Sequence, residues 1–502
     1  MKKLTFLFLV TGMWIRGYAQ RAAKPEVIPV VIIMADQLRH DALGEFTPNI
    51  DSLAADGITF ERTYCASPLC APSRAAFFTG RYPNDNGGLI NGWNETDAHY
   101  RNVRPGVPNL YEIMSKYWRG VQSGKQHFFT KDPIEKNPKV KMTWITQEDY
   151  NAWMKSQGVQ KPGGRAFTAI VPELVSGKYT YERRYTVPVL APYTPGVSYF
   201  PDHYFADKAV EAIRTPSEKP LLLITTFMSP HPPFNIPEPY YSLVHDSDLT
   251  VPSDVGKWYP GQSPLQLYQL TGFIGTRYSR AQWIRIWDKY FGLVKLLDDQ
   301  VGSVIHALKA RGLYDKALVI FTADHGEMLG SHSLWMKNCM YEPSARVPLI
   351  MKFPKGFHPR VKKTDALVSL IDVWPTLRDY LHIPDADSTD GVSLMPLLRG
   401  EGLSRKKIFI QYDGNSAYGG NQRSVVDGDF KLIIDTFTSQ VYLELYNVKT
   451  DPLETKNLAL DPAYEKTTKK LIGEIRGYMG RTHDLLHFPD QTYEQFITHY
   501  RK

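Results

Sequence analysis

The chain has 502 residues, of which 43% are hydrophobic, 13% aromatic and 22% charged. This apolar fraction excludes a mainly disordered protein, and the length is enough for about two to three domains. Three cysteines exclude a disulfide scaffold and a multi-cysteine zinc module. Nucleic acid is not the expected partner, because the sequence has no Lys/Arg run, helix-turn-helix or zinc-finger pattern.

Residues 1–19 predict a secretory signal peptide. Lys2 and Lys3 precede a short apolar segment, which ends in the small residues Gly17 and Ala19. The segment is too short for a transmembrane helix, so we expect an exported, periplasmic or secreted protein without stable membrane insertion. Removing it takes away three basic residues and lowers the formal net charge from +7 to about +4. This modest excess is compatible with an anionic substrate but does not identify one.

Residues 20–400 predict a large α/β domain with a mainly parallel central sheet flanked by helices. Three continuous apolar segments are typical of strands buried on both faces: residues 27–34, 221–228 and 317–323. A further strand is predicted at 58–64, and helices are predicted at 48–56 and 287–311. Thr47, Pro48 and Gly57 supply the end signals of the first helix. The alternation of strands and helices favours the α/β class.

From about residue 401 the pattern changes to a smaller α+β subdomain with an antiparallel sheet. Short strands separated by Gly, Asp and Asn turns are predicted at 406–413, 430–435 and 441–448, followed by a polar helix near 464–478. Residues 130–205 and 235–285 are rich in Pro, Tyr, Gly and Trp without clear periodicity. Such long insertions either build substrate pockets or pack as surface loops, and the sequence leaves both readings open.

Polar side chains follow the predicted central strands. Ligands bind beyond the carboxyl ends of the strands in open α/β sheets. Asp36 and Gln37 follow the first strand, and Asp324 and His325 follow the strand at 317–323. Together these side chains can hold a divalent cation, and the oxygen ligands favour Ca²⁺, Mg²⁺ or Mn²⁺. A lone Asp after a strand is more often a cap or turn residue, an alternative that two such pairs weaken.

The segment from Cys70 to Arg74 is the second chemical feature. Pro72 fixes a turn, and residues 73–78 can begin a helix whose positive end favours anionic oxygens. From spacing alone, Cys70 is a buried thiol, a metal ligand or a nucleophile.

The sequence CAPSRAAFFTGR at residues 70–81 resembles the signature of the type I, formylglycine-dependent sulfatases, C-x-P-S-R followed by T-G-R. The resemblance extends over nearly the whole mature chain. It includes the segments ADQLRHDALG, TPNIDSLAADGITF, GKQH, SPHPPF, TADHGEMLG, DGVSLMPLLRG and ELYNVKTDPLETKNLA. It implies an alkaline-phosphatase-like fold and a sulfuric ester hydrolase.

The resemblance also implies roles for individual residues. Cys70 would be oxidised by a partner maturation enzyme to formylglycine, whose hydrate is the nucleophile, and Arg74 would stabilise that hydrate. Lys125 and Lys337 would bind sulfate oxygens, His127 would lie beside the nucleophile, and His231 would protonate the leaving alcohol. The metal ligands would be Asp36, Gln37, Asp324, His325 and the modified Cys70. If Lys125 and His127 lie on a strand, their spacing places them on one face.

Two features depart from the commonest family pattern. Asp36-Gln37 replaces Asp-Asp, and Asp324-His325 replaces Asp-Asn. The Asp-His version also occurs in iduronate-2-sulfatase-like members. Ca²⁺ therefore stays the expected metal, with Mn²⁺ or Mg²⁺ as alternatives. Related phosphonate monoester hydrolases and phosphodiesterases share the signature and a similar Gln/His metal set but tend to lack the Lys-x-His pair, here Lys125 and His127. This pair favours a sulfatase.

The leading interpretation is an exported sulfatase that cleaves sulfate esters of carbohydrates, including saccharides derived from glycosaminoglycans. The alternatives are a phosphonate monoester or phosphodiester hydrolase on the same scaffold, and an inactive sulfatase-like protein that binds sulfated glycans. Cys65 and Cys339 both lie near the predicted site in the sequence, which motivates the hypothesis that they form a disulfide.

Overall fold

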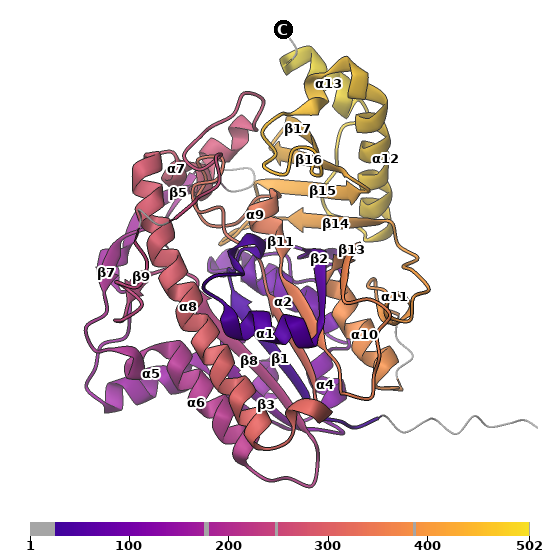
Figure 1. The fold of residues 1–502 in the computed structure, drawn as a ribbon. Helices are drawn as coiled ribbons and strands as arrows, with labels where there is room; N and C mark the ends of the chain where they lie inside the picture. Colours follow the sequence, from indigo (N-terminus) through magenta and orange to yellow (C-terminus); the bar gives the residue numbers. More distant parts are fainter. Residues whose placement is uncertain (1–25, 175–179, 246–248, 385–387, 501–502) are drawn as a thin grey trace, which may run out of the picture.

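The computed structural model describes residues 26–174, 180–245, 249–384 and 388–500 (Figure 1). The predicted signal peptide at residues 1–19 lies outside the described residues. Within the described residues, no helix is long and apolar enough to cross a membrane.

A mixed central sheet organises the larger part of the molecule, in the order β11-β2-β12-β10-β1-β8-β3-β4, with β13 paired to β2. Its strands are β1 (Val30–Asp36), β2 (Ile58–Tyr64), β3 (Arg119–Gly124), β4 (Met142–Ile145), β8 (Leu221–Pro230), β10 (Leu318–Ala323), β11 (Arg346–Val347), β12 (Leu349–Lys352) and β13 (Lys363–Ser369). The run from β10 through β1, β8 and β3 to β4 is parallel, whereas β12 runs antiparallel to β10 and β2. The predicted mainly parallel sheet is confirmed. The continuous apolar runs end up on its central strands because helices cover both faces.

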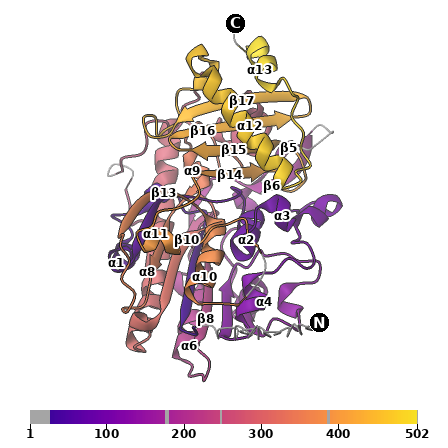
Figure 2. The ribbon, with the colours of Figure 1, turned by 90° about the vertical axis from the view of Figure 1, so that its right-hand side faces the viewer.

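Two groups of helices enclose this sheet (Figure 2). One group is α1 (Pro48–Asp56), α6 (Pro201–Arg214) and α8 (Arg280–Ala310), and the other is α2 (Cys70–Thr79), α4 (Leu110–Met114) and α10 (Val373–Tyr380). The helix predicted at 287–311 begins earlier, at Arg280, because Ser279 and Gln282 form a capping box there. Helix α2 is buried along its whole length, which explains its almost uninterrupted small and apolar sequence.

A separate antiparallel sheet occupies the C-terminal part, in the order β14-β15-β16-β17. Its elements are β14 (Lys407–Tyr412), β15 (Asn421–Asp427), β16 (Phe430–Phe437), β17 (Gln440–Asn447), α12 (Glu465–Arg481) and α13 (Thr492–Tyr500). Strand β15 was not predicted, because its sequence NQRSVVD is mostly polar. The polar side chains are nevertheless buried, and the Arg423 guanidinium forms ion pairs with Asp413 and Asp484. The domain boundary at residue 400 stays a prediction.

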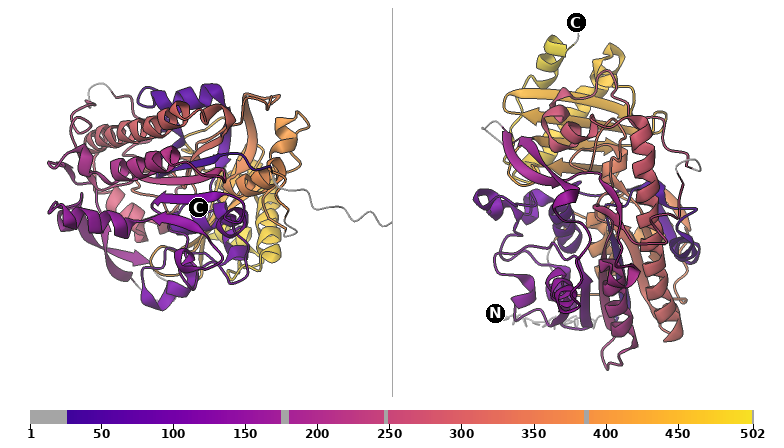
Figure 3. Two further views of the ribbon diagram at one scale, coloured as in Figure 1. Left: turned by 90° about the horizontal axis from the view of Figure 1, so that it is seen from below. Right: turned by 90° about the vertical axis from the view of Figure 1, so that its left-hand side faces the viewer.

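The two irregular insertions are partly ordered into short elements. Helix α5 (Gln147–Ser156) and the hairpin of β5 (Thr168–Leu174) and β6 (Thr180–Thr186) come from the first one. Figure 3 shows this hairpin beside the C-terminal sheet, and the Tyr185 hydroxyl lies 3.1 Å from Ser416 Oγ. The remaining short elements are α3 (Pro83–Asn86), α7 (Leu270–Gly275), α9 (Glu342–Ala345), α11 (Met395–Leu398), β7 (Leu190–Pro192) and β9 (Phe234–Ile236).

Candidate active site

Four potential ligands meet where the carboxyl ends of β1 and β10 approach the first turn of α2. Asp36 ends β1, Asp324 and His325 follow β10, and Cys70 is the first residue of α2. Their ligand atoms all lie within 4.8 Å of one another, and all four residues are buried. The parallel pairing of β1 with β10 causes this meeting, because it sets Ala35 opposite Ala323. The structure thus brings together residues that are about 290 positions apart in the sequence.

Two cations surround the carboxylates of this cluster. The Arg74 Nε donates to Asp324 Oδ2 at 2.9 Å, and its guanidinium lies 3.4 Å from Asp36 Oδ2. The Lys125 ammonium contacts Asp36 and lies 3.7 Å from Cys70 Sγ. Burial alone would raise the pKa of Asp36, but these cations and the nearby His231 hold it well below its usual value. The ionised form of Asp36 is therefore favoured, which suits the cluster to binding a cation.

Cys70 lies in a field that favours its ionised form. Its Sγ is 3.1 Å from His325 Nε2 and 3.9 Å from Asp36 Oδ1. Burial and Asp36 act to raise the pKa of the thiol, yet Lys125, Lys337 and His325 outweigh them and lower it. The other two cysteines are different.

Cys65 and Cys339 are free and buried, so the hypothesis of a disulfide between them is wrong for this structure. Burial raises the pKa of both thiols. Each of these two thiols is packed in the core, and no disulfide joins them.

Gln37 lies beside the cluster and is held by two other polar side chains. Its Oε1 accepts a hydrogen bond from Lys337, and its Nε2 donates to Glu327. Its backbone has a φ of 71°, in the left-handed region, and its N–H donates to Asp324 Oδ1 at 3.1 Å. Sequence reasoning did not single out Glu327, although it follows Asp324 and His325 in the same short segment. Glu327 is fully buried and positions the Gln37 amide.

Lys125 and His127 lie beyond the end of β3, so the condition under which they would share a strand face is not met. Strand β3 ends at Gly124, whose φ is 106°, and His127 has a φ of 43°. The chain turns out of the sheet here because Gly124 packs directly against the backbone of Thr226. The turn sends Lys125 to Asp36 and leaves His127 near the ring of Trp93, at a centroid distance of 5.5 Å.

His127 and His231 are both half-buried, and their surroundings favour the neutral imidazole. Burial and Lys125 lower the pKa of His127, and burial and Lys337 lower the pKa of His231. His231 Nδ1 contacts the Pro232 carbonyl. Since a carbonyl can only accept, Nδ1 carries the proton of the neutral ring and Nε2 is the atom left for proton exchange. Among the described residues, His127 Nδ1 has no hydrogen-bond partner.

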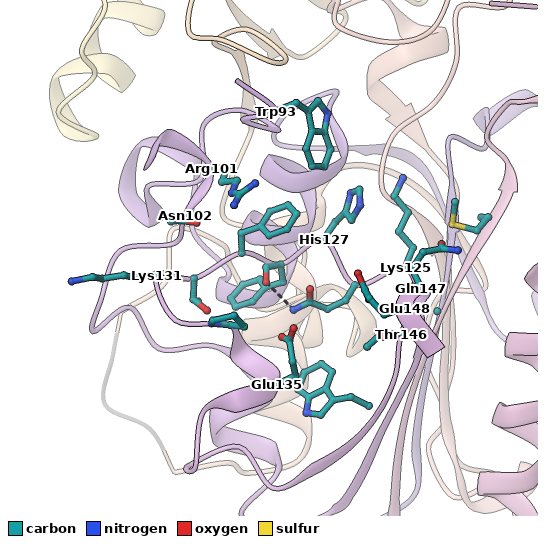
Figure 4. A pocket seen from close by; sticks show the side chains of 18 residues that line it. Trp93, Arg101, Asn102, Lys125, His127, Lys131, Glu135, Thr146, Gln147 and Glu148 are labelled. Atoms are coloured by element: carbon teal, nitrogen blue, oxygen red, sulfur yellow. Dashed lines mark hydrogen bonds between the residues drawn. The ribbon is translucent and has the colours of Figure 1, made fainter. Parts of the chain in front are cut away.

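A cavity of about 550 Å³ adjoins the cluster on the side of Lys125 and His127. Figure 4 shows Trp93, Arg101 and His127 around it, with Glu135 farther along the wall. The cavity is large enough for a small organic group next to the reacting centre.

The chain matches the sulfatase family model over residues 29–383. It also matches the model of the C-terminal part of N-sulphoglucosamine sulphohydrolase over residues 330–479. The sulfatase YidJ of Escherichia coli is 27% identical over 91% of this chain and 86% of its own length. An arylsulfatase of Clostridium perfringens is 27% identical over 89% of this chain and 94% of its own.

Several solved structures share the fold. The phosphonate monoester hydrolase of Agrobacterium radiobacter has a TM-score of 0.73 at 21% identity, covering 91% of this chain and 96% of that one. A 2-O GAG sulfatase has a TM-score of 0.69 at 23% identity, and the match covers 91% of this chain and 93% of that one. The chain belongs to the sulfatase family, with an alkaline-phosphatase-like fold, and it is a sulfuric ester hydrolase.

Proposed function

We propose that this sulfatase is exported and hydrolyses sulfate esters of carbohydrates, including glycosaminoglycan-derived saccharides, with formylglycine at position 70 and a divalent cation. The observation that carries the proposal is the buried cluster around Cys70, in which two carboxylates and an imidazole meet three cationic side chains. The 2-O GAG sulfatase with the same fold supports the carbohydrate part. The predicted signal peptide supports export.

The residues present fit a divalent cation. Asp36 and Asp324 offer hard oxygen ligands, His325 offers a nitrogen, and position 70 completes the set. We assign Gln37 a place beside them, because Lys337 and Glu327 fix its amide. This donor set suits Ca²⁺, with Mn²⁺ or Mg²⁺ as alternatives. When bound, the cation would draw charge from a sulfate oxygen, and formylglycine would supply the nucleophilic oxygen.

The charged side chains of the chain bind and orient the sulfate. The Lys125 ammonium contacts Asp36, and the Lys337 ammonium contacts Gln37. Both ammonium groups would bind sulfate oxygens, whose negative charge grows in the transition state. Arg74 fixes the geometry, since it contacts the Asp324 carboxylate and the Lys125 carbonyl. This places a preorganised cationic surface around the sulfur position.

The two half-buried histidines, His127 and His231, would move the protons. His231 Nε2 would donate a proton to the leaving alcohol, and His127 would accept one beside position 70. Both imidazoles have a lowered pKa in the free enzyme. Binding of an anionic sulfate beside His231 would raise the pKa of His231 and so favour the protonated form that acts as the acid.

A phosphonate monoester hydrolase is the second candidate, and the fold of the Agrobacterium enzyme favours it. The presence of Lys125 and His127 favours the sulfatase. The test is release of inorganic sulfate from a panel of sulfated mono- and disaccharides, beside a phosphonate monoester, by wild type and Lys125→Ala. We expect sulfate release from one regiochemistry and a loss of about 100-fold or more in the variant. Turnover of only the phosphonate, unchanged by the substitution, would move the assignment to the second candidate.

The cofactors and export have their own tests. Chelation should abolish sulfate release, and one of Ca²⁺, Mn²⁺ or Mg²⁺ should restore it; full activity in chelator would exclude the metal. Co-expression with a formylglycine-generating enzyme should raise specific activity.

N-terminal sequencing of the exported protein should find cleavage after Ala19, and an intact N-terminus would refute the signal peptide.

A further inference from the structure

The cavity beside Lys125 and His127 has walls unlike those of the charged cluster. Aromatic side chains form much of it, among them Trp93, Phe129 and Trp144. Lys125 and His127 belong to both the cavity and the site where sulfate would bind. A substrate whose sulfate lies against Lys125 can therefore extend its remaining part into this cavity.

Arg101 is a cation in this cavity without a counter-charge. Its guanidinium lies 4.8 Å from the centre of the Phe129 ring. Its Nε is buried and has no hydrogen-bond partner among the described residues, and no described carboxylate lies within 4.0 Å of its nitrogens. A guanidinium that is partly removed from water without a partner is costly, and a ligand anion would satisfy it.

Trp93 provides a rigid apolar surface next to Arg101. Its side chain is 36% exposed, and its ring lies edge-on to His127 at 5.5 Å and to Phe129 at 6.1 Å. These contacts hold the indole at the cavity while leaving part of it accessible. Partly exposed tryptophan surface packs well against the C–H groups of a pyranose ring, because it is large and loses little conformational freedom.

The acidic residues of the cavity lie elsewhere. Glu135 and Glu148 are exposed, and Figure 4 places Glu135 across the cavity from Arg101. Their negative charges would repel an anion from that end of the cavity, so the anion would bind at the end where Arg101 lies. The charges along the wall thus distinguish the two ends of a bound molecule.

We propose that this cavity is a specificity subsite for a sugar ring that carries a second anionic group, which Arg101 binds while Trp93 packs against the ring. The second group is a carboxylate, as in a hexuronate, or a second sulfate. The inference rests on the proposed function, because the first sulfate must occupy the site beside Lys125. The proposed subsite narrows the substrate class to sulfated saccharides that carry at least two negative charges.

The test compares kcat/KM for three sulfated disaccharides: one with a hexuronate carboxyl, the same one with that carboxyl reduced to an alcohol, and a doubly sulfated one without a carboxyl. Wild type, Arg101→Gln and Arg104→Gln are measured. Arg104 is the matched control, because it is an exposed arginine of the same segment outside the cavity. In Arg101→Gln, the preference for the charged over the reduced substrate should fall about 10- to 100-fold. Arg101→Lys should recover part of it.

The outcomes separate the two proposals. The charged substrate that loses most in Arg101→Gln identifies the second group as carboxylate or sulfate. An unchanged preference in Arg101→Gln, with normal thermal stability, overturns the subsite while the sulfatase assignment stands. Equal losses on the charged and the reduced disaccharide also overturn it. Absence of sulfate release from every substrate by formylglycine-containing wild type would overturn the proposed function, and the subsite with it.

Discussion

At the reacting centre, burial and neighbouring charges shift the pKa of Asp36, Cys70 and His231. His231 is the clearest case, because burial and Lys337 lower its pKa and the Pro232 carbonyl fixes the proton of the neutral ring on Nδ1. Its acid form is therefore scarce at neutral pH in the free enzyme and becomes more populated as the pH falls toward the lowered pKa. A reaction that needs this acid has a distinctive pH dependence.

We predict that kcat/KM for an alkyl or sugar sulfate falls as the pH rises from about 5 to 8, since the protonated fraction of His231 decreases. An aryl sulfate, whose leaving group needs no proton, should have a flatter profile. His231→Ala should lower turnover of the sugar sulfate by about 10²- to 10⁴-fold and remove the difference in pH dependence. His203→Ala, at a part-exposed histidine of α6, is the control. Identical profiles for both ester types in wild type would contradict this role.

The sequence was sufficient to predict the residues whose position follows from strand ends and from the signature. Asp36 and Asp324 are examples, since each directly follows an apolar strand. Glu327 and Arg101 were missed for a physical reason. Glu327 contacts Gln37 and Arg101 contacts Phe129, and these contacts depend on separate segments meeting in space. No local pattern marks such contacts.

At the level of the elements, the end of β3 positions the Lys125 side chain. Gly124 has a φ of 106°, and a Cβ at this position would lie 1.9 Å from the Thr226 carbonyl oxygen of β8. Lys125 N donates to the same oxygen at 3.0 Å. The close approach of β3 and β8 is therefore what directs Lys125 towards Asp36.

Gly124→Ala should separate β3 from β8 and displace Lys125. We expect a loss of about 2–4 kcal/mol in the free energy of unfolding and a large loss of sulfate release, measured by urea unfolding and by activity. Gly158→Ala is the matched control, because Gly158 also has a positive φ, of 66°, but no atom within 4 Å of its added Cβ. It should cost about 1 kcal/mol and leave activity intact. Equal effects of the two substitutions would refute the steric account.

Some elements could be predicted from apolar patterns and end signals, such as β2 and α1, whose observed bounds agree with expectation. Strand β15 could not be predicted in this way, because its buried positions hold polar residues. Arg423, for example, forms an ion pair with the distant Asp484. The turn after Gly124 also escaped prediction, because period-two spacing alone cannot show where a strand ends.

At the scale of the whole molecule, a buried polar network joins the segment around α9, which follows Lys337, to the C-terminal sheet. Lys431 on β16 lies 2.9 Å from Glu342, which follows the segment that carries Lys337. The Tyr341 hydroxyl lies 2.5 Å from the Glu444 carboxylate on β17. The C-terminal sheet therefore supports the active-site segment, and its buried acids couple folding to pH.

Burial raises the pKa of Glu444 to about 8, far above the value of an unfolded chain. The folded protein then binds a proton that the unfolded chain has released, so this contribution to stability is complete below the unfolded pKa and is lost as the pH rises toward 8. We predict that the free energy of unfolding of wild type falls relative to that of Glu444→Gln as the pH rises from 5 to 8.5. The change in this difference should be on the order of 2–4 kcal/mol. Denaturant unfolding at both pH values measures this. Glu401→Gln, at an exposed position, should track wild type, and parallel curves for Glu444→Gln and wild type would contradict the assignment.

The central claim is that catalysis depends on residue 70 in its oxidised form. The most direct measurement determines the fraction of formylglycine at position 70 by mass spectrometry and the rate of sulfate release in the same preparations, with Cys70→Ala and Cys339→Ala alongside. We predict that the rate is proportional to the formylglycine fraction, is lost in Cys70→Ala with folding preserved, and stays near wild type in Cys339→Ala. Sulfate release by Cys70→Ala at the wild-type rate would contradict the account.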